Sequence, residues 1–350
     1  MNPTIDDKYI LEKYLGYGGT SKVFLGTGIE GKVAIKIVRK DKNFTRKQEQ
    51  ILISNEWKIM ENIDGTHPNI VNMIEYRTEG TEMMQVRDLS ESVDTLSNKI
   101  LDISYSVTEY CPNGSMYDHI AKNGPLPEQV AQFFFKQLVS AVKFLHDQNI
   151  AHWDIKPGNI FFDEFFNVKL GDFGWALKLK GKNYGVTKCF GTKSYMAPEV
   201  FRASEKAPFS PFWADVYALG ATLYFMLTGK TQQLTDTSNS TENDSERESY
   251  DYCTSQVYVW NSTLLKQSIW NISTIDTYTG GLENHTALTF SDDLPLILDL
   301  IEGSTLKYPN ERVKIEDFYG HPWMEAENSE DCWASIFEFM SMEQPNNTTG

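Results

Sequence analysis

The sequence has little cysteine, and no Cys-x-x-Cys pair occurs among its four widely spaced cysteines, Cys111, Cys189, Cys253 and Cys332. This spacing argues against both a zinc site and a disulfide framework. The longest apolar run, at residues 216–227, is shorter than the roughly 20 residues that a membrane-spanning helix needs. The amino terminus lacks the basic flank and apolar core of a secretory signal. We therefore expect a soluble protein with reduced thiols, no membrane partner, and a location in the cytoplasm or the nucleus.

Positive charge is also scarce. The chain has 48 Asp and Glu but 32 Lys and Arg, so its formal net charge is -16. This excess opposes binding to nucleic acid or to an acidic membrane surface, so any phosphate must be held by a local site. The rest of the composition is that of a globular protein, with 41% hydrophobic and 23% charged residues, and the 350 residues suggest two domains or lobes.

The first third of the chain alternates strand-like runs with one helix. Residues 33–38 are apolar and β-branched, and residues 23–28 are their expected hairpin partner across Gly28 and Gly31. Residues 49–63 place apolar side chains at helical spacing. The pattern also predicts two further strands and a polar surface insertion between them, at residues 70–76, 103–110 and 77–98 respectively.

The remainder of the chain is mostly helical. Residues 127–147 repeat apolar side chains at helical spacing, and residues 214–228 are apolar all round, which predicts a helix at the centre of a large lobe. Residues 231–285 read as a partly ordered insertion. The acidic tail has one apolar helical face, through which it could dock on the chain: Trp333, Ile336, Phe337 and Met340.

A glycine-rich turn, Leu15-Gly-Tyr-Gly-Gly-Thr-Ser21, stands between two strand-like runs, so its backbone could approach a phosphate closely. A dinucleotide-binding fold would need a helix directly after the glycines, but residues 23–25 read as a strand. Lys36 lies in the next strand and could hold phosphate oxygens as a point charge, although an isolated lysine is usually a surface residue. Glu56, on the following helix, could pair with Lys36 and fix its direction.

A second group of polar residues occupies positions 154–159. Asp154, Lys156 and Asn159 must lie on a loop, because the Pro-Gly pair between them breaks any helix. Asp154 can orient a hydroxyl nucleophile and accept its proton, and Lys156 can neutralise charge on a transferred phosphoryl group. The amide oxygen of Asn159 can ligate Mg²⁺, and Asp172 supplies a second oxygen ligand.

Taken in order, these residues resemble the eukaryotic protein kinases. The resemblance runs from Tyr9 to Trp323 and rests on the glycine-rich loop, Val-Ala-Ile-Lys36, Glu56, His67-Pro-Asn, His-Trp-Asp154, Asp-Phe-Gly174 and Ala-Pro-Glu199. It implies a two-lobed α+β fold, ATP and Mg²⁺ as cofactors, and phosphoryl transfer to a protein hydroxyl. Asp-Ile-Lys-Pro-Gly-Asn and Gly-Thr192 are similar to the serine/threonine branch, in which Thr192 would help to hold Asp154 and Lys156.

The same resemblance assigns the remaining roles. Glu109 and Cys111, behind a Thr108 gatekeeper, would bond the adenine through their backbone, Arg312 would pair with Glu199, and Asp215 would anchor the catalytic loop. The expected catalytic residues are Asp154, Lys156, Asn159 and Thr192, and the expected metal ligands are Asn159 and Asp172. The expected cofactor-binding residues are Leu15, Gly16, Gly18, Ser21, Val23, Ala34, Lys36, Glu56, Thr108, Glu109, Cys111 and Phe161.

Two positions depart from the family pattern. Ser21 replaces the third loop glycine, for which we expect a modest loss of nucleotide affinity at most. Trp153 stands where kinases switched by phosphorylation carry an arginine that holds the phosphate of the activation loop. We therefore hypothesise that activity does not depend on phosphorylating that loop, near Thr187 and Lys188. A pseudokinase, a nucleotide-binding scaffold without turnover, remains the alternative.

These patterns predict four parts of the chain: an N-terminal extension at 1–8, an N-lobe with a small β-sheet and one main helix at 9–109, the hinge and a mainly helical C-lobe at 110–323, and the acidic tail at 324–350. The insertions are expected at about 77–98 and about 231–285. The expected partner is a protein with a Ser or Thr acceptor and not a nucleic acid. A docking role for the second insertion or the tail stays open.

Overall fold

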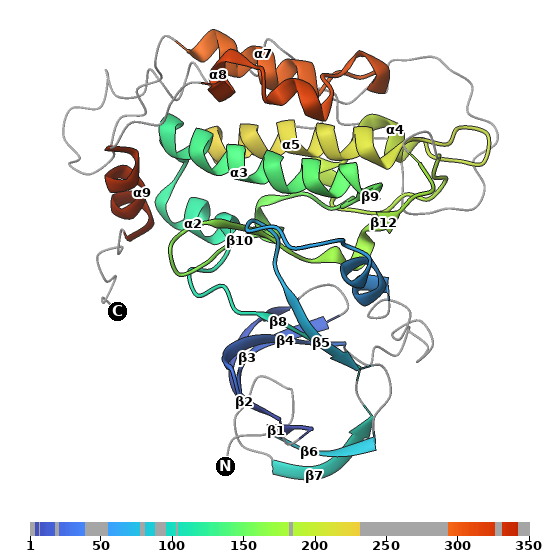
Figure 1. Cartoon of the computed structure of the whole chain (residues 1–350), viewed down its shortest axis with the longest axis vertical. Coiled ribbons are helices and arrows are strands. Elements are labelled where there is room, and N and C mark those ends of the chain that lie inside the picture. The colour runs from blue at the N-terminus through green and yellow to red at the C-terminus, as the bar shows by residue number, and fades with distance from the viewer. Residues whose placement is uncertain are drawn as a thin grey trace, which may run out of the picture. The chain divides into compact units, whose positions relative to one another are not determined.

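The computed structural model describes residues 4–6, 8–17, 21–38, 55–77, 81–87, 96–102, 104–181, 185–231, 293–325 and 331–341. Gly18 and all but the first residue of the expected insertion at 231–285 lie outside these ranges. The chain forms two compact units, an N-terminal unit of residues 1–112 with segment 172–176, and a C-terminal unit of the other residues. The first is rich in strands and the second in helices, as expected for a two-lobed α+β fold (Figure 1).

The N-terminal unit contains an antiparallel sheet in the order β1-β2-β3-β4-β8-β5. The predicted hairpin is confirmed, because β3 and β4 pair across Gly28 and Gly31. Gly31 has a φ of 124°, which favours glycine. The strands are β1 (Thr4–Ile5), β2 (Tyr9–Tyr17), β3 (Ser21–Gly28), β4 (Gly31–Val38), β5 (Met73–Arg77) and β8 (Tyr105–Glu109).

One face of this sheet forms the core of the unit. On β4 the buried side chains of Val33, Ile35 and Ile37 alternate with Ala34 and Lys36, because successive side chains of a strand point to opposite faces. Ala34 and Lys36 therefore project from the face away from the core. The core cluster consists of Ile5, Tyr9, Leu11, Val33, Ile35, Ile37, Tyr105 and Val107.

The polar stretch expected as a plain insertion contains a second, two-stranded sheet. Strands β6 (Thr81–Arg87) and β7 (Leu96–Asp102) pair antiparallel (Figure 1). The segment mixes polar and apolar residues without regular alternation, so its sequence pattern did not separate these strands from a loop. The neighbouring strands are shorter than predicted, since β5 starts at Met73 and β8 at Tyr105.

The C-terminal unit is built around two long helices that lie side by side, α3 (Glu128–Asp147) and α5 (Pro211–Thr228) (Figure 1). They confirm the helices predicted at 127–147 and 214–228, and α5 is buried along almost its whole length. In the described part of the chain no helix is long and apolar enough to cross a membrane. The other labelled helices are α2 (Met116–Asn123), α4 (Pro198–Phe201), α7 (Leu294–Ser304), α8 (Pro322–Glu325) and α9 (Asp331–Ser341).

The loops between these helices contain short strands and 3-10 turns. Strand β9 (Ile150–Ala151) pairs with β12 (Leu177–Lys178), and β10 (Ile160–Phe162) pairs with β11 (Val168–Leu170). The predicted catalytic residues 154–159 therefore lie between two anchored strands, β9 and β10. The single 3-10 turns are η1 (Pro157–Asn159), η2 (Phe173–Trp175), η3 (Lys193–Tyr195), η5 (Pro309–Glu311) and η6 (Ile315–Phe318).

The tail forms helix α9, which packs on α2 and α3. Its buried residues are Ile336, Phe339 and Met340. The predicted face does contact the unit: the ring of Trp333 lies 4.8 Å from that of Phe133 and the ring of Phe337 lies 5.5 Å from that of Phe166, although both stay about half exposed. A helical pattern gives the angle between side chains, but the surface on which the helix docks decides which of them is covered.

We expect Phe339→Ala to lower the free energy of unfolding by about 3 kcal/mol, because its buried ring would leave a cavity beneath α9. Phe337→Ala is the matched control, since Phe337 is 48% exposed and Phe339 only 5%. The control should lower this free energy by less than about 1 kcal/mol. Urea denaturation followed by circular dichroism measures both losses, and equal losses would contradict docking through the face of Phe339.

Candidate active site

The face of the N-terminal sheet away from the core brings several predicted nucleotide-binding residues together. The strand register places Val23 opposite Lys36, and Ala34 opposite Thr108. Directly paired residues project from the same side of an antiparallel sheet, so all four lie on one face. Each is partly exposed there.

Glu109 ends β8 and is fixed at both its backbone and its side chain. Its N–H donates to the Asn72 carbonyl at 3.0 Å, and its carboxylate accepts the Asn72 N–H at 2.8 Å. These bonds set the path of the chain that continues to Cys111. The remaining predicted residues in the described ranges are Leu15 and Gly16 on β2, Ser21 on β3, and Phe161 on β10 of the C-terminal unit.

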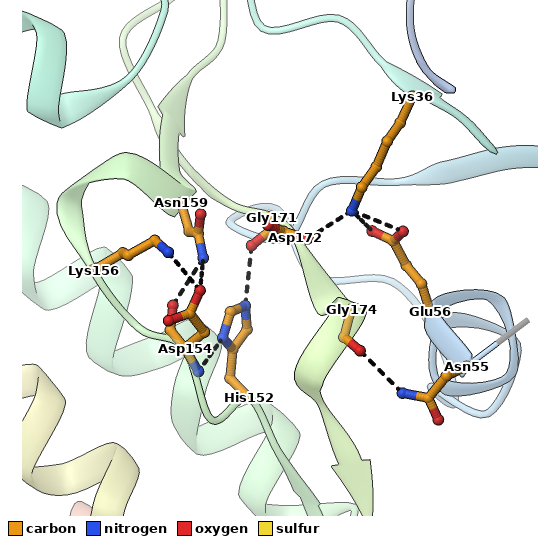
Figure 2. Close-up of polar contacts among 10 residues, drawn as sticks. All are labelled: Lys36, Asn55, Glu56, His152, Asp154, Lys156, Asn159, Gly171, Asp172 and Gly174. Carbon is orange, nitrogen blue, oxygen red and sulfur yellow. Dashed lines mark hydrogen bonds and ion pairs between the residues drawn. The ribbon is translucent and has the colours of Figure 1, made fainter. Parts of the chain in front are cut away.

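Lys36 lies between two carboxylates. Its Nζ donates to Asp172 Oδ1 at 2.7 Å and to Glu56 Oε2 and Oε1 at 3.1 and 3.4 Å (Figure 2). Burial by itself lowers the pKa of Lys36, but Asp172 and Glu56 together raise it above its usual value, so the ammonium stays charged at neutral pH. Burial raises the pKa of the Glu56 carboxyl, while Lys36 acts in the opposite direction. The expected partner Glu56 is therefore present, and Asp172 joins the pair.

Asp172 begins a segment with a constrained backbone. Its φ of 60° is in the left-handed region that few non-glycine residues occupy. Gly174 follows in the same 3-10 turn, where an added Cβ would lie 3.4 Å from Asp172 Oδ1 and 3.9 Å from Lys36 Nζ. Both are ordinary van der Waals distances, so Gly174 lies directly beside the ion pair without crowding it.

In the C-terminal unit, hydrogen-bond donors surround the buried carboxylate of Asp154. Its Oδ2 accepts from Lys156 Nζ at 2.6 Å and from Asn159 Nδ2 at 3.0 Å (Figure 2). Its Oδ1 accepts from the N–H and the hydroxyl of Thr192 at 3.1 and 2.9 Å. Lys156 also donates to Thr192 Oγ1 at 2.7 Å. The four predicted catalytic residues thus form one hydrogen-bonded group.

Asp215 of α5 holds the backbone of this loop through two hydrogen bonds. Its two carboxylate oxygens accept the N–H groups of His152 and Trp153, both at 2.8 Å. Trp153 has a φ of 61°, and these bonds stabilise that left-handed conformation. The His152 ring is also committed to the backbone, since Nδ1 accepts the Asp154 N–H at 3.3 Å and Nε2 donates to the Gly171 carbonyl at 3.0 Å (Figure 2).

A sequence profile of the protein kinase domain matches residues 9–324. The chain belongs to the protein kinase family. The profile match ends at residue 324, within α8, so helix α9 lies beyond the matched domain.

Several named kinases are similar to this one. It is 33% identical over 235 residues to the CBL-interacting serine/threonine-protein kinase 16 of Arabidopsis thaliana, covering 64% of this chain and 44% of that protein. It is 28% identical over 334 residues to a probable myosin light chain kinase of Dictyostelium discoideum, covering 93% of this chain and 55% of that protein. It is 33% identical over 224 residues to the maternal embryonic leucine zipper kinase of Xenopus tropicalis, covering 63% and 30%. The kinase chain thus spans about half or less of these relatives.

The predicted ion pair between Arg312 and Glu199 is confirmed in this kinase. Two guanidinium nitrogens of Arg312 donate to the two Glu199 oxygens, each at 2.7 Å. The buried guanidinium also donates to the carbonyls of Leu306 and Trp213, both at 2.8 Å, and packs over the ring of Tyr217. This bidentate pair ties the start of α4 to the chain that follows α7.

Trp153 places a large apolar side chain where the resemblance leads us to expect arginine. The side chain is 7% exposed, and its ring centroid is 5.7 Å from those of both Phe190 and Phe209. The indole Nε1 has no hydrogen-bond partner within the described residues. The loop therefore packs on two segments, one before α4 through Phe190 and one before α5 through Phe209. The buried cluster contains Trp153, Met196, Ala197, Val200, Phe209, Ala214 and Tyr217.

The residues of this kinase suit Mg²⁺ as a cofactor. Asn159 bonds to Asp154 through its amide nitrogen, which leaves the amide oxygen for a cation. Asp172 offers a carboxylate whose side chain is 40% exposed. Hard oxygen ligands of this kind match the preference of Mg²⁺, which also keeps waters and substrate phosphates in its shell. Within the described ranges, no group of three or more His, Cys, Asp or Glu residues could hold a metal by itself.

Sequence reasoning missed two residues that support the site. His146 places Nε2 2.9 Å from Asp215 Oδ2, and Asn55 donates to the carbonyls of Gly174 and Ala176. Neither belongs to a spaced motif. The only signal for Asn55 was its position next to Glu56.

We expect Thr187→Ala to leave the rate of phosphorylation unchanged, because the Trp153 cluster holds the nearby chain without a phosphate. Trp153→Ala, which empties that cluster, should lower the rate and reduce the free energy of unfolding by about 3 kcal/mol. Both follow from initial rates and urea denaturation of phosphatase-treated protein. A large loss of rate in Thr187→Ala, with folding intact, would contradict phosphorylation-independent activity.

Proposed function

We propose that this kinase transfers the γ-phosphoryl group of Mg-ATP to Ser and Thr hydroxyls of protein substrates. The observation that carries the proposal is the single hydrogen-bonded group formed by Asp154, Lys156, Asn159 and Thr192. A carboxylate, an ammonium, an amide and a hydroxyl are the groups that proton acceptance, charge neutralisation and metal ligation require. The relatives named as serine/threonine kinases support the acceptor class.

Asp154 is the group that would orient the acceptor hydroxyl and take its proton. Because donors hold both of its oxygens, the carboxylate has a fixed direction before substrate arrives, which favours catalysis by positioning. Lys156 would neutralise charge on the transferred phosphoryl group, and Thr192 would keep Lys156 and Asp154 together. Asn159 and Asp172 would hold Mg²⁺, which supplies neutralisation of phosphate charge when bound.

Lys36 would bind the phosphates of ATP from the face of the sheet that carries Val23, Ala34 and Thr108. Its charge is secured by Glu56 and Asp172 before the nucleotide binds. The backbone of Glu109 and Cys111 would bond the adenine. This arrangement favours a nucleotide over another phosphate ester. The Lys36 ammonium, which would bind phosphate, and a partly exposed apolar strand surface, which would contact the base, lie on one face of the sheet.

The second candidate function is a pseudokinase that binds nucleotide and partners without turnover. Trp153 favours it, because this residue removes the arginine through which many kinases are switched on. The complete Asp154 group favours an active enzyme instead. The acceptor protein, a location in the cytoplasm or the nucleus, and a docking role for residues 231–285 or the tail belong to the same proposal. The net charge of -16 favours cationic substrates.

We expect Asp154→Asn to lower phosphate incorporation by about 100-fold or more, because an amide cannot accept the hydroxyl proton. The assay uses labelled ATP, Mg²⁺ and a generic basic protein substrate. Asp147→Asn is the matched control, since Asp147 lies on the surface and pairs with Lys143 one helical turn away. Equal incorporation by wild type and Asp154→Asn would overturn the enzyme proposal and leave the scaffold.

We expect Lys36→Met to reduce kcat/KM for ATP by about 100-fold or more, because the phosphates lose their fixed cation. Lys32→Met is the control on the same strand, where the exposed Lys32 pairs with Glu12 instead. Initial rates over a series of ATP concentrations measure both variants. Similar values for the two lysine variants would rule out Lys36 as the phosphate-binding residue.

A further inference from the structure

The structure describes the helix predicted at 49–63 from residue 55, and residues 55–61 are helical. Three successive residues at the start of this described part contact different neighbours. Glu56 bonds to Lys36, and Trp57 stacks on Tyr76 of β5 with ring centroids 4.2 Å apart. Asn55 turns towards the segment that follows Asp172 (Figure 2). Successive helical residues point about 100° apart, so three consecutive side chains can contact three neighbours at once. The contacts of Glu56 and Trp57 fix the helix to the sheet. The contact of Asn55 attaches the helix to the segment at 172–176.

The Asn55 amide nitrogen lies 3.3 Å from the Gly174 carbonyl oxygen and 3.2 Å from the Ala176 carbonyl oxygen. A primary amide carries two N–H hydrogens, so it can serve both carbonyls together. If the nitrogen and oxygen of the Asn55 amide were exchanged, the amide oxygen would face the two carbonyl oxygens with no hydrogen between them. This assignment is therefore excluded. Aspartate at position 55 would have no hydrogen to donate, and leucine would match the size of asparagine without its polarity.

The segment at 172–176 has little internal structure to hold it. Its regular part is one 3-10 turn, closed by the bond from the Ala176 N–H to the Phe173 carbonyl at 3.1 Å. Such single turns are weak by themselves. The helix adds three bonds from two adjacent residues, because the Glu56 carboxylate accepts the Phe173 N–H and Asn55 serves two carbonyls. Both the N–H and the carbonyl sides of the segment are thus attached to the same helix.

We propose that Asn55 is a positioning residue that fastens segment 172–176 to the helix and thereby sets the Asp172 carboxylate at Lys36. Because Glu56 and Asn55 are adjacent, the helix cannot leave Lys36 without also pulling on the carbonyls of Gly174 and Ala176. The part of this proposal that concerns Mg²⁺ rests on the proposed function, since it takes Asp172 as a metal ligand.

The position of the segment can be read from Trp175, which lies inside it. The protein is labelled with 5-fluorotryptophan, and Trp175→Phe assigns the Trp175 resonance in the ¹⁹F spectrum. Asn55→Leu should shift or split that resonance, because two lost hydrogen bonds raise the population of a detached segment by about tenfold. Asn62→Leu is the matched control on the same stretch of chain, since the exposed Asn62 amide bonds to its own helix at the Lys58 carbonyl, 2.6 Å away. Asn55→Gln, which keeps both donors, should restore part of the wild-type signal.

The second readout is the Mg²⁺ concentration that gives half-maximal phosphorylation. Asn55→Leu should raise it by about tenfold while KM for the protein substrate stays constant, because Asp172 is affected and the acceptor site is not. The other tryptophan resonances report whether the variant is folded. If it is unfolded, the same measurements on Asn55→Gln and Asn55→Asp decide, and the Trp175 resonance of Asn55→Gln is expected to be closer to wild type than that of Asn55→Asp.

The possible results distinguish a failure of the role proposed for Asn55 from a failure of the proposed function. A wild-type Trp175 resonance in Asn55→Leu would overturn the fastening role. A displaced resonance with an unchanged Mg²⁺ requirement in an active enzyme would overturn the positioning of Asp172. A displaced resonance in a protein that phosphorylates nothing, wild type included, would support the fastening and overturn the proposed function.

Discussion

The ion cluster of Lys36, Glu56 and Asp172 is the interaction on which the rest of the N-terminal unit depends. An ammonium withdrawn from water is costly unless carboxylates surround it, and removal of one partner leaves the others uncompensated. Lys36 comes from a sheet, Glu56 from a helix and Asp172 from a segment more than a hundred residues later. The cluster therefore forms only when the sheet, the helix and the segment are all in place. If one of them moves away, a buried charge loses its partner.

In the C-terminal unit, hydrogen bonds to the backbone hold the catalytic loop in place. Trp153 has a left-handed backbone conformation that an isolated residue would leave, and Asp215 holds it by accepting consecutive N–H groups. Asp154 follows directly and is oriented by Lys156 and Thr192. A buried carboxylate on a rigid helix thus supports a strained loop, and that loop presents a second carboxylate in a defined direction.

The two units differ in how their segments are kept in place. Around Lys36 the contacts are ionic and directional, so they respond to changes of charge and to a bound phosphate. Around Trp153 they are apolar, with Phe190 and Phe209 packed on the indole ring. Packing of this kind does not need a covalent modification. Trp153 thus keeps the loop before Asp154 packed against its neighbours without a charged partner.

The two lobes, the β3–β4 hairpin, the long helices and the residues available for chemistry were predictable from the sequence, because periodicity and side-chain type are local properties. The role of Asn55 became visible only in the folded chain, because its partners are the backbone carbonyls of Gly174 and Ala176. Every residue has a backbone carbonyl, so no sequence pattern singles these two out. The same holds for how deeply each side chain of α9 is covered and for the pairing of β6 with β7. Contacts of this kind depend on where a distant surface lies, and no local pattern encodes that position.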